Sequence, residues 1–458
     1  MDELDKLRKK IINSDTFCFY PYLEISTRPN GSVLPCCYWD EQVSLFQQEK
    51  ITKSNPIENF WNNNKVITIR KSLHEGKVLE GCNICARDGD ASMRARSIRE
   101  NINNRDYLQL VYDTILNNGK ANHTPRRLEI KPSNLCNLKC VMCNAYDSSQ
   151  IEKELHELSK KYNGIKTYGG RFNKIVGGRI GVWEGNIGEF ELPDMANSDW
   201  AESEEFWDYL KIILPNLNVL SFAGGEPTIN PIVHKVLQYC VENNYAKNIT
   251  VFISSNFTNL NKKFFQLMPH FNKFELIASI DGIGPVQEYV RFPSDWETIK
   301  RNFETARAYM KYPNVKILIN ITVHILNIFY LDELLNYIDN KFLEYPYYKE
   351  WPYNINLLNY PEELKIDWIP ESLKTVIIDK IKTYQNNSTT LKFFPELKIK
   401  TDLLISELSK ISDIENSYIN LNHLHTIIKT LDTHRESKYK ESLPILDNIF
   451  ESKLSHDK

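Results

Sequence analysis

The sequence predicts an α/β fold in which six strand–helix units form a partial (β/α)6 barrel. Three observations lead to this prediction. Apolar runs alternate with amphipathic helical patterns over residues 119–360, most cysteines lie in residues 1–118 or soon after, and residues 361–458 contain neither glycine nor cysteine. With 458 residues, the chain is long enough for two or three domains. We therefore expect a small cysteine-rich α+β domain, the partial barrel and a helical C-terminal region.

The composition is that of a globular protein and gives no support for two classes of partner. Apolar residues make up 42%, charged residues 25%, and the net charge is −3. Near-balanced charge does not favour nucleic acid or an anionic membrane surface. The start, "MDELDKLRKKIINSDTF", lacks the apolar core of a signal peptide, and no run of 18 apolar residues exists. We expect a cytoplasmic protein with no membrane segment.

The N-terminal region combines a β-hairpin with a helix. In "YLEISTRPNGSVLPCC", apolar and polar residues alternate around Asn30-Gly31, which is a strong hairpin signal. The segment "NPIENFWNNNKVITIRKSLHEG" predicts a helix that begins near Pro56 and ends before Gly76. The motif "EGCNIC" follows it.

Six strands are expected in the central region, and each is joined to the next by helical sequence. A parallel sheet with right-handed crossovers is the arrangement that such alternation favours. The expected strands are "RRLEIKPS", "LNVLSFAGG", "NITVFISSN", "KFELIASIDG", "VKILINITVH" and "YNINLLNY". The helices between them include "SQIEKELHELSKKY", "SEEFWDYLKIIL", "NPIVHKVLQYCVEN", "NKKFFQLMPHF", "DWETIKRNFETARAYMKY" and "YLDELLNYIDN".

Two further segments, a glycine-rich insertion and the C-terminal region, each allow two interpretations. Residues 164–188 hold eight of the 17 glycines, which suggests an insertion over 164–200 that serves either as an active-site lid or as a surface decoration. The C-terminal region contains the amphipathic patterns "ESLKTVIIDKIKTYQ" and "LNHLHTIIKTLDTHRE". We interpret it as a helical cap or a partner-binding face.

Three cysteines lie within eight residues in "NLCNLKCVMC", namely Cys136, Cys140 and Cys143. A disulfide uses two thiols, and a tetrahedral zinc site uses four ligands. Three thiolates on a four-iron cluster leave one iron open for a small molecule. The loop follows a predicted strand directly, and ligands bind at that edge of α/β sheets. The alternative is a zinc site with a distant fourth ligand.

A second motif follows the next predicted strand, in "FAGGEPTINP". Gly224 and Gly225 let the backbone approach a ligand closely, and their carbonyl oxygens can accept hydrogen bonds from an ammonium group. Glu226 and Pro227 complete the motif. Four such residues alone are a weak signal, but their place after a strand and downstream of the cysteine loop strengthens it.

The C-x3-C-x2-C loop and the Gly-Gly-Glu-Pro motif resemble those of the radical S-adenosylmethionine (radical SAM) enzymes. The resemblance implies that Cys136, Cys140 and Cys143 bind a 4Fe–4S cluster. It also implies that the second motif holds the methionine amino group of S-adenosylmethionine. Met142 stands where the family usually has an aromatic residue, and it would be the apolar neighbour of the adenine. The resemblance further suggests cofactor contacts at Ser255, Asn256, Ser279, Asp281 and Arg291.

Four N-terminal cysteines make a second constellation. Twelve residues separate Cys18 from Gly31, four separate Gly31 from Cys36, and Cys82-x2-Cys85 completes the set. Four thiols can hold zinc or a fully ligated 4Fe–4S cluster. The spacing resembles the auxiliary-cluster domains of the same superfamily, called SPASM or twitch domains. Those domains usually follow the barrel, whereas this segment precedes it.

Two cysteines remain outside these sets. Cys37 is an alternative ligand to Cys36, but the Gly-x4-Cys spacing favours Cys36. Cys240 lies on a predicted helix and is expected to be a buried structural thiol.

The resemblance implies an enzyme that reductively cleaves S-adenosylmethionine to a 5′-deoxyadenosyl radical, which abstracts hydrogen from a substrate. Two 4Fe–4S clusters, S-adenosylmethionine and a reductant such as flavodoxin or ferredoxin are implied. Auxiliary-cluster domains suggest a peptide or protein substrate. Small molecules and nucleic acid are alternative substrates, and a non-enzymatic zinc-binding interaction protein is the alternative class. No residue outside the motifs is identified as an acid or base.

Overall fold

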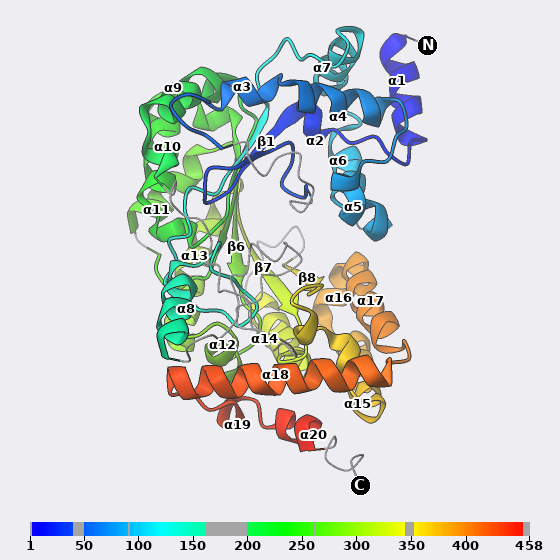
Figure 1. The fold of residues 1–458 in the computed structure, drawn as a ribbon, viewed down its shortest axis with the longest axis vertical. Coiled ribbons are helices and arrows are strands. Elements are labelled where there is room, and N and C mark those ends of the chain that lie inside the picture. Colours follow the sequence, from blue (N-terminus) through cyan, green and yellow to red (C-terminus); the bar gives the residue numbers. More distant parts are fainter. Residues whose placement is uncertain are drawn as a thin grey trace. The chain divides into compact units, whose positions relative to one another are not determined.

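The computed structural model describes residues 2–39, 50–89, 92–161, 199–260, 262–343 and 352–451. The chain divides into two compact units that interleave along the sequence (Figure 1). The first contains residues 1–134, 194–253 and 270–273, and the second contains residues 135–193, 254–269 and 274–458. The boundaries predicted at residues 118 and 360 remain a prediction.

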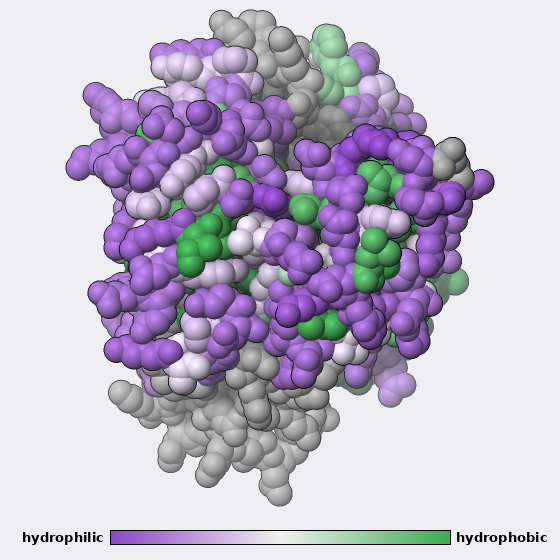
Figure 2. All heavy atoms as spheres, turned by 90° about the horizontal axis from the view of Figure 1, so that it is seen from above, coloured by the Kyte–Doolittle hydropathy of each residue, from purple (hydrophilic) through white to green (hydrophobic). Residues whose placement is uncertain are grey.

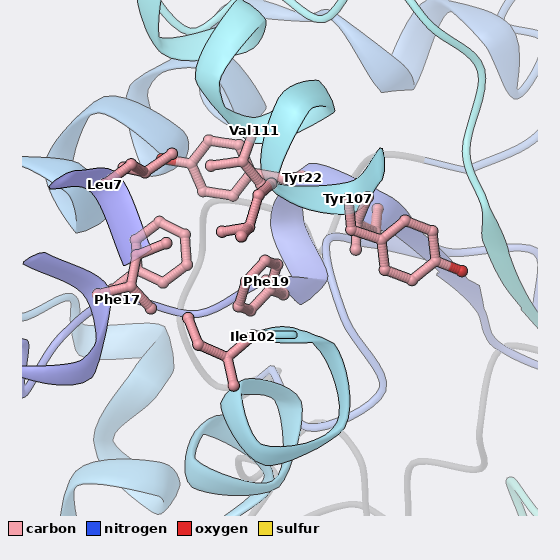
Figure 3. Packing of buried hydrophobic residues seen from close by; sticks show 10 residues of the cluster. Leu7, Phe17, Phe19, Tyr22, Ile102, Tyr107 and Val111 are labelled. Carbon is pink, nitrogen blue, oxygen red and sulfur yellow. The ribbon is translucent and has the colours of Figure 1, made fainter. Parts of the chain in front are cut away.

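A small aromatic and aliphatic core holds the N-terminal helices of the first unit together. Phe19 and Tyr22 are fully buried there, and Phe17 stacks on Tyr22 with ring centroids 5.5 Å apart (Figure 3). This core contributes to stability through burial of apolar surface. The helices of this unit are α1 (Glu3–Ile12), α2 (Tyr20–Leu23), α3 (Glu58–Trp61), α4 (Asn64–His74), α5 (Asn83–Asp88), α6 (Met93–Asn101), α7 (Arg105–Leu116), α9 (Glu204–Ile213) and α10 (Pro231–Glu242).

The strands of the first unit are β1 (Glu24–Thr27), β2 (Val33–Leu34), β3 (Arg127–Ile130), β4 (Val219–Phe222) and β5 (Thr250–Ser255), which continues into the second unit. β1 and β2 form the antiparallel hairpin predicted around Asn30-Gly31, and Gly31 has a φ of 80°. β1 also pairs in parallel with β3, with Ser26 opposite Glu129. β3, β4 and β5 are parallel neighbours in that order. The pairing of β1 with β3 was not predicted.

The second unit contributes β6 (Lys273–Ser279), β7 (Val315–Val323) and β8 (Tyr353–Leu357), which are parallel neighbours in that order. Along β7, buried residues alternate strictly with partly exposed ones. Its helices are α8 (Ser149–Lys161), α11 (Lys262–Leu267), α12 (Pro285–Val290), α13 (Trp296–Arg307), α14 (Leu331–Leu343), α15 (Glu371–Asn387), α16 (Thr389–Phe393), α17 (Lys398–Leu408), α18 (Ile414–Arg435), α19 (Tyr439–Ser442) and α20 (Ile445–Glu451).

Polar side chains fix the starts of several helices that join the strands. The side chains of Ser203, Asn230 and Asp295 accept hydrogen bonds from backbone amides in the first turns of α9, α10 and α13. Such caps satisfy donors that the helix itself leaves unpaired. Asn63 caps α4 in the same way, which is why the single helix predicted from Pro56 is divided into α3 and α4.

The predicted alternation of strands and helices and the α/β fold class are confirmed. Residues 162–198, which include most of the glycine-rich insertion, lie outside the described residues. No helix within the described ranges has both the length and the apolar character needed to cross a membrane. The face drawn in Figure 2 is mainly hydrophilic with scattered apolar residues, which is ordinary for a globular surface.

Candidate functional site

The three cysteines of the C-x3-C-x2-C loop pack together in the second unit. Cys136 and Cys140 are buried and contact Leu138, while Met142 and Cys143 are partly buried against the same group. None of the three forms a disulfide. Burial raises the pKa of the Cys143 thiol well above its ordinary value, and the neighbouring thiols raise it further. A bound metal cluster would take up the thiolate charge that burial otherwise disfavours.

Backbone hydrogen bonds hold this loop against α12 and the segment after it. The Val141 amide donates to the Val290 carbonyl at 2.9 Å, and the Lys139 amide donates to the Phe292 carbonyl at 2.5 Å. Both donors lie between the cysteines, so these bonds fix the backbone that carries the thiols.

Arg291, which directly follows α12, brings a positive charge to the loop. Its Nη1 lies 3.8 Å from the Cys140 sulfur, and its Nε donates to Asp281 at 2.7 Å. The other carboxylate oxygen of Asp281 accepts from the Thr322 amide at 2.7 Å. Burial raises the pKa of Cys140, and the charges of Arg291 and Arg435 oppose that increase. Asp281 thus holds Arg291 in place, and the cofactor contacts that the resemblance suggests for these two residues remain predictions.

A ring of three hydrogen bonds connects the cysteine loop to the end of β5. Asn256 donates to Asn137 at 2.9 Å, Asn137 donates to Thr258 at 2.7 Å, and Thr258 donates to Asn256 at 2.6 Å. Asn137 directly follows the first cysteine. The neighbouring Ser255 is buried, and Ser279 at the end of β6 is partly exposed. Their contacts with a cofactor remain predictions.

The Gly-Gly-Glu-Pro motif forms a tight turn after β4 in the first unit. Gly224 and Gly225 have φ values of 74° and 60°, which favour glycine. A Cβ on Gly224 would lie 2.8 Å from the Lys131 Cβ, so only glycine fits there without a shift. Glu226 is buried, and its carboxylate accepts from the Thr228 amide at 3.1 Å. The motif therefore has the backbone geometry of a close-approach loop.

The four N-terminal cysteines Cys18, Cys36, Cys82 and Cys85 line a single cavity. Burial raises the pKa of both Cys18 and Cys82 to about 12, with further contributions from neighbouring thiols in the set. The aromatic side chain of Trp39 lines the same cavity. Four thiols in one largely apolar cavity are a donor set that suits a fully ligated cluster.

Cys37 differs from Cys36 in its surroundings. Its amide donates to Glu24 at 3.1 Å, and its carbonyl accepts from Arg28 at 3.1 Å. Among the residues described, Cys36 lines the four-thiol cavity and Cys37 does not. This arrangement favours Cys36 as the ligand. Cys240 is completely buried on α10, away from both sets in the sequence.

Within the described part of the chain, no three His, Cys, Asp or Glu side chains converge closely enough to ligate a single metal ion. Each thiolate of a four-iron cluster binds a different iron, so its sulfurs stand farther apart than the ligands of one zinc ion.

Two buried ion pairs near β1 and β3 were not predicted. Arg127 lies 3.2 Å from Glu24, and Arg28 lies 3.4 Å from Glu129. The sequence carries one signal for them, since Arg127 and Glu129 alternate with apolar residues in the predicted strand. That alternation indicates a polar face opposite the buried one.

Comparison with known proteins matches both motif regions to family models. Residues 130–338 match the Radical SAM superfamily, and residues 18–86 match the SPASM iron–sulfur cluster-binding domain. These two ranges belong to those families, and the second begins at Cys18 and includes Cys85. The chain therefore contains a Radical SAM domain and a SPASM domain, which indicate an enzyme whose cofactors are 4Fe–4S clusters and S-adenosylmethionine.

No curated protein matches the sequence. Solved structures with some similarity include SuiB of Streptococcus suis, at 15% identity over 73% of this chain and 67% of SuiB, with a TM-score of 0.35. SuiB bound to precursor peptide SuiA matches at 15% identity over 69% and 64%, with a TM-score of 0.34. Native anSMEcpe with bound AdoMet and Cp18Cys peptide matches at 16% identity over 57% and 59%, with a TM-score of 0.34. The family assignment rests on the two matched domains.

Proposed function

We propose that Cys136, Cys140 and Cys143 hold a 4Fe–4S cluster whose open iron binds S-adenosylmethionine. A bound cluster would supply the electron for reductive cleavage of S-adenosylmethionine to methionine and a 5′-deoxyadenosyl radical, which would take a hydrogen atom from the substrate. We propose that Cys18, Cys36, Cys82 and Cys85 hold an auxiliary cluster.

One observation carries this proposal, namely three cysteines packed in one group with the Arg291 guanidinium 3.8 Å from the Cys140 sulfur. A buried cation favours the thiolate form that a cluster requires. Arg291 is itself held by Asp281, so the charge is fixed before the cluster binds. The packing of Leu138 and Met142 around the thiols limits access of water to this group.

The second motif supports a role in binding the methionine part of S-adenosylmethionine. Positive φ angles at Gly224 and Gly225 turn the backbone sharply. We propose that carbonyl oxygens of this turn accept hydrogen bonds from the ligand's ammonium group. The buried Glu226 stabilises the turn through its bond to the Thr228 amide.

The substrate we propose is a peptide or protein. The presence of an auxiliary-cluster domain in the same chain supports this class by analogy. We propose an electron donor such as flavodoxin or ferredoxin. We also propose a reducing compartment such as the cytoplasm, because nine cysteines outside disulfides would otherwise be prone to oxidation.

The test compares the wild-type protein with a variant in which Cys136, Cys140 and Cys143 are all alanine. Both are reconstituted with iron and sulfide without oxygen and incubated with S-adenosylmethionine and dithionite. We expect the wild type to form 5′-deoxyadenosine, and the variant to form none. Iron should fall from about eight to about four per chain, since the auxiliary site is retained. A variant that keeps all its iron, or a wild type that yields no 5′-deoxyadenosine, would contradict the proposal.

A further inference from the structure

The C-terminal helix α18 contributes to the surroundings of the cysteine loop. A cavity in the second unit is lined by Cys140 and Cys143 on one side and by residues of α8 and α18 on the other. The residues from α18 are Leu424, Ile427, Leu431 and Arg435. The C-terminal half of α18, from Leu424 to Arg435, therefore lines the cavity beside two of the three thiols.

A buried charge network joins α18 to the loop through α8. Arg435 donates to both oxygens of Glu154, through Nε at 2.9 Å and Nη2 at 2.6 Å. The exposed fractions of these two side chains are 4% and 2%. Lys139, the residue before Cys140, places its Nζ 3.4 Å from Glu154. Glu154 is thus shared between a cation on the loop and a cation on the C-terminal helix.

A second contact joins the same end of α18 to α12. The Tyr289 hydroxyl of α12 donates to Asp432 at 3.0 Å. The Arg435 guanidinium also lies over the ring of Phe292, 5.3 Å from its centroid. Since Phe292 accepts the backbone hydrogen bond from Lys139, α18 contacts both elements that hold the loop.

Charges of both signs surround the cysteine loop. The cations are Arg291, Lys139 and Arg435, and the anions include Asp281, Glu154, Asp432 and Glu363. Arg435 lines the cavity beside Cys140 and Cys143. A cluster that gains an electron becomes more negative, so a fixed cation beside it stabilises its reduced form.

We propose that Arg435 is a positioning residue for the radical SAM cluster, which fixes the cysteine loop through Glu154 and Lys139 and favours the reduced cluster by its charge. The proposal rests on the proposed assignment of Cys136, Cys140 and Cys143 as the cluster ligands. It gives the C-terminal region a role in the chemistry of the site rather than that of a general cap.

The experiment is an anaerobic redox titration of reconstituted protein, followed by electron paramagnetic resonance. The signal that changes shape when S-adenosylmethionine is added identifies the cluster of interest. Arg435→Gln removes the positive charge and leaves Glu154 in place. We expect the ratio of reduced to oxidised cluster at a fixed potential to fall by about tenfold, which is about 59 mV for a one-electron couple. Arg435→Lys keeps the charge and should restore most of this ratio.

Two further variants separate this effect from general damage. Lys438→Gln removes a positive charge three residues away at an exposed position, where the side chain is 72% exposed, and should leave the ratio unchanged. Glu154→Gln removes an anion instead, so the ratio should shift in the opposite direction to that of Arg435→Gln. Because loss of structure gives no such reversal, this variant tests the proposal even if Arg435→Gln folds poorly.

An unchanged ratio in Arg435→Gln would overturn the proposal, and so would shifts of the same sign in Arg435→Gln and Glu154→Gln. A wild-type protein with no signal that responds to S-adenosylmethionine would instead overturn the cluster assignment on which the proposal rests. The two failures are therefore distinguishable in one set of titrations.

Discussion

Asp281 illustrates how one buried carboxylate can hold a cation beside a thiol. Its side chain is fully buried, and its two oxygens accept from Arg291 and from the Thr322 amide. Removing one partner of such a pair leaves an uncompensated buried charge, which costs about 3–5 kcal/mol. The carboxylate is therefore best understood as the support of Arg291, and Arg291 as the group that faces Cys140.

Gly225 gives a prediction at the scale of one residue. With φ at 60°, it lies in the left-handed region, where a branched side chain is strained by about 1–2 kcal/mol. In Gly225→Val the backbone should leave this conformation, and the side chain would stand where the ligand approaches. We expect S-adenosylmethionine to bind at least about tenfold more weakly, a loss of about 1.4 kcal/mol, with no loss of iron. Calorimetry on the anaerobic protein measures this affinity.

Gly76→Val is a matched control for the backbone strain that Gly225→Val introduces. Gly76 has a φ of 82° at the end of α4, and a Cβ there would meet no neighbour within 4 Å. Gly76→Val therefore introduces similar backbone strain in open space, and it should leave affinity for S-adenosylmethionine unchanged. Equal affinities in the two variants would exclude the assigned role of Gly225.

Some residues of the candidate site could be predicted from the sequence, and others could not. The cysteines and the Gly-Gly-Glu-Pro turn were found because their spacing is local. Glu154 and Arg435 were not found, because they are separated by 281 residues and only the folded chain brings them together. In the sequence, Arg435 is an ordinary basic residue in the last turn of a helix. A positive charge there interacts favourably with the helix dipole, so nothing in the sequence indicates a further role for it.

At the scale of elements, periodicity predicted most helices and strands of the α/β region. β7, for example, alternates buried and partly exposed residues over its whole length. The pairing of β1 with β3 was not predictable in this way, since strand pairing between distant segments depends on registers that no local pattern encodes. The same limit explains why the N-terminal hairpin was expected to be separate from the parallel sheet.

The short turn that carries Cys82 gives a prediction about contact between elements. A Cβ on Gly81 would overlap the ring of Trp39, which follows the β-hairpin and lines the four-thiol cavity. Gly81→Ala should displace the ring or the turn and so disturb the ligand Cys82 beside it. We expect loss of the auxiliary cluster, with iron falling from about eight to about four per chain, while S-adenosylmethionine still binds.

A double variant checks the cause of that loss. Trp39→Leu removes the ring atoms that the added methyl group would meet. In this background, Gly81→Ala should cause little further loss of iron, so the two changes should be strongly non-additive. Additive losses of iron would show that the turn is disturbed for another reason than the contact with Trp39.

At the scale of the whole molecule, the chain presents its two domains in an unusual order. The SPASM match lies at residues 18–86, before the radical SAM match at residues 130–338. The N-terminal segment is nevertheless part of the first unit's sheet, because β1 pairs with β3. Each cysteine set lies within one unit, the four N-terminal thiols in the first and the loop thiols in the second. The two clusters should therefore be separable by mutation.

Changing Cys82 and Cys85 together to alanine tests that separation and the role of the auxiliary cluster. If this cluster relays electrons or anchors substrate, turnover of a substrate should fail. Cleavage of S-adenosylmethionine with dithionite alone should survive, because the loop thiols and their surroundings are intact. Measuring 5′-deoxyadenosine with and without substrate distinguishes the two activities.

Stability has to be measured beside activity, because metal binding at a four-thiol site also contributes folding free energy. A cluster that only clamps the N-terminal segment predicts a lower melting temperature by circular dichroism and loss of both activities together. A cluster with a direct part in turnover predicts that cleavage persists in a folded variant while substrate modification stops. Wild-type melting together with intact cleavage and intact substrate turnover would contradict any functional role for Cys82 and Cys85, because both thiols would then be dispensable for folding and for chemistry.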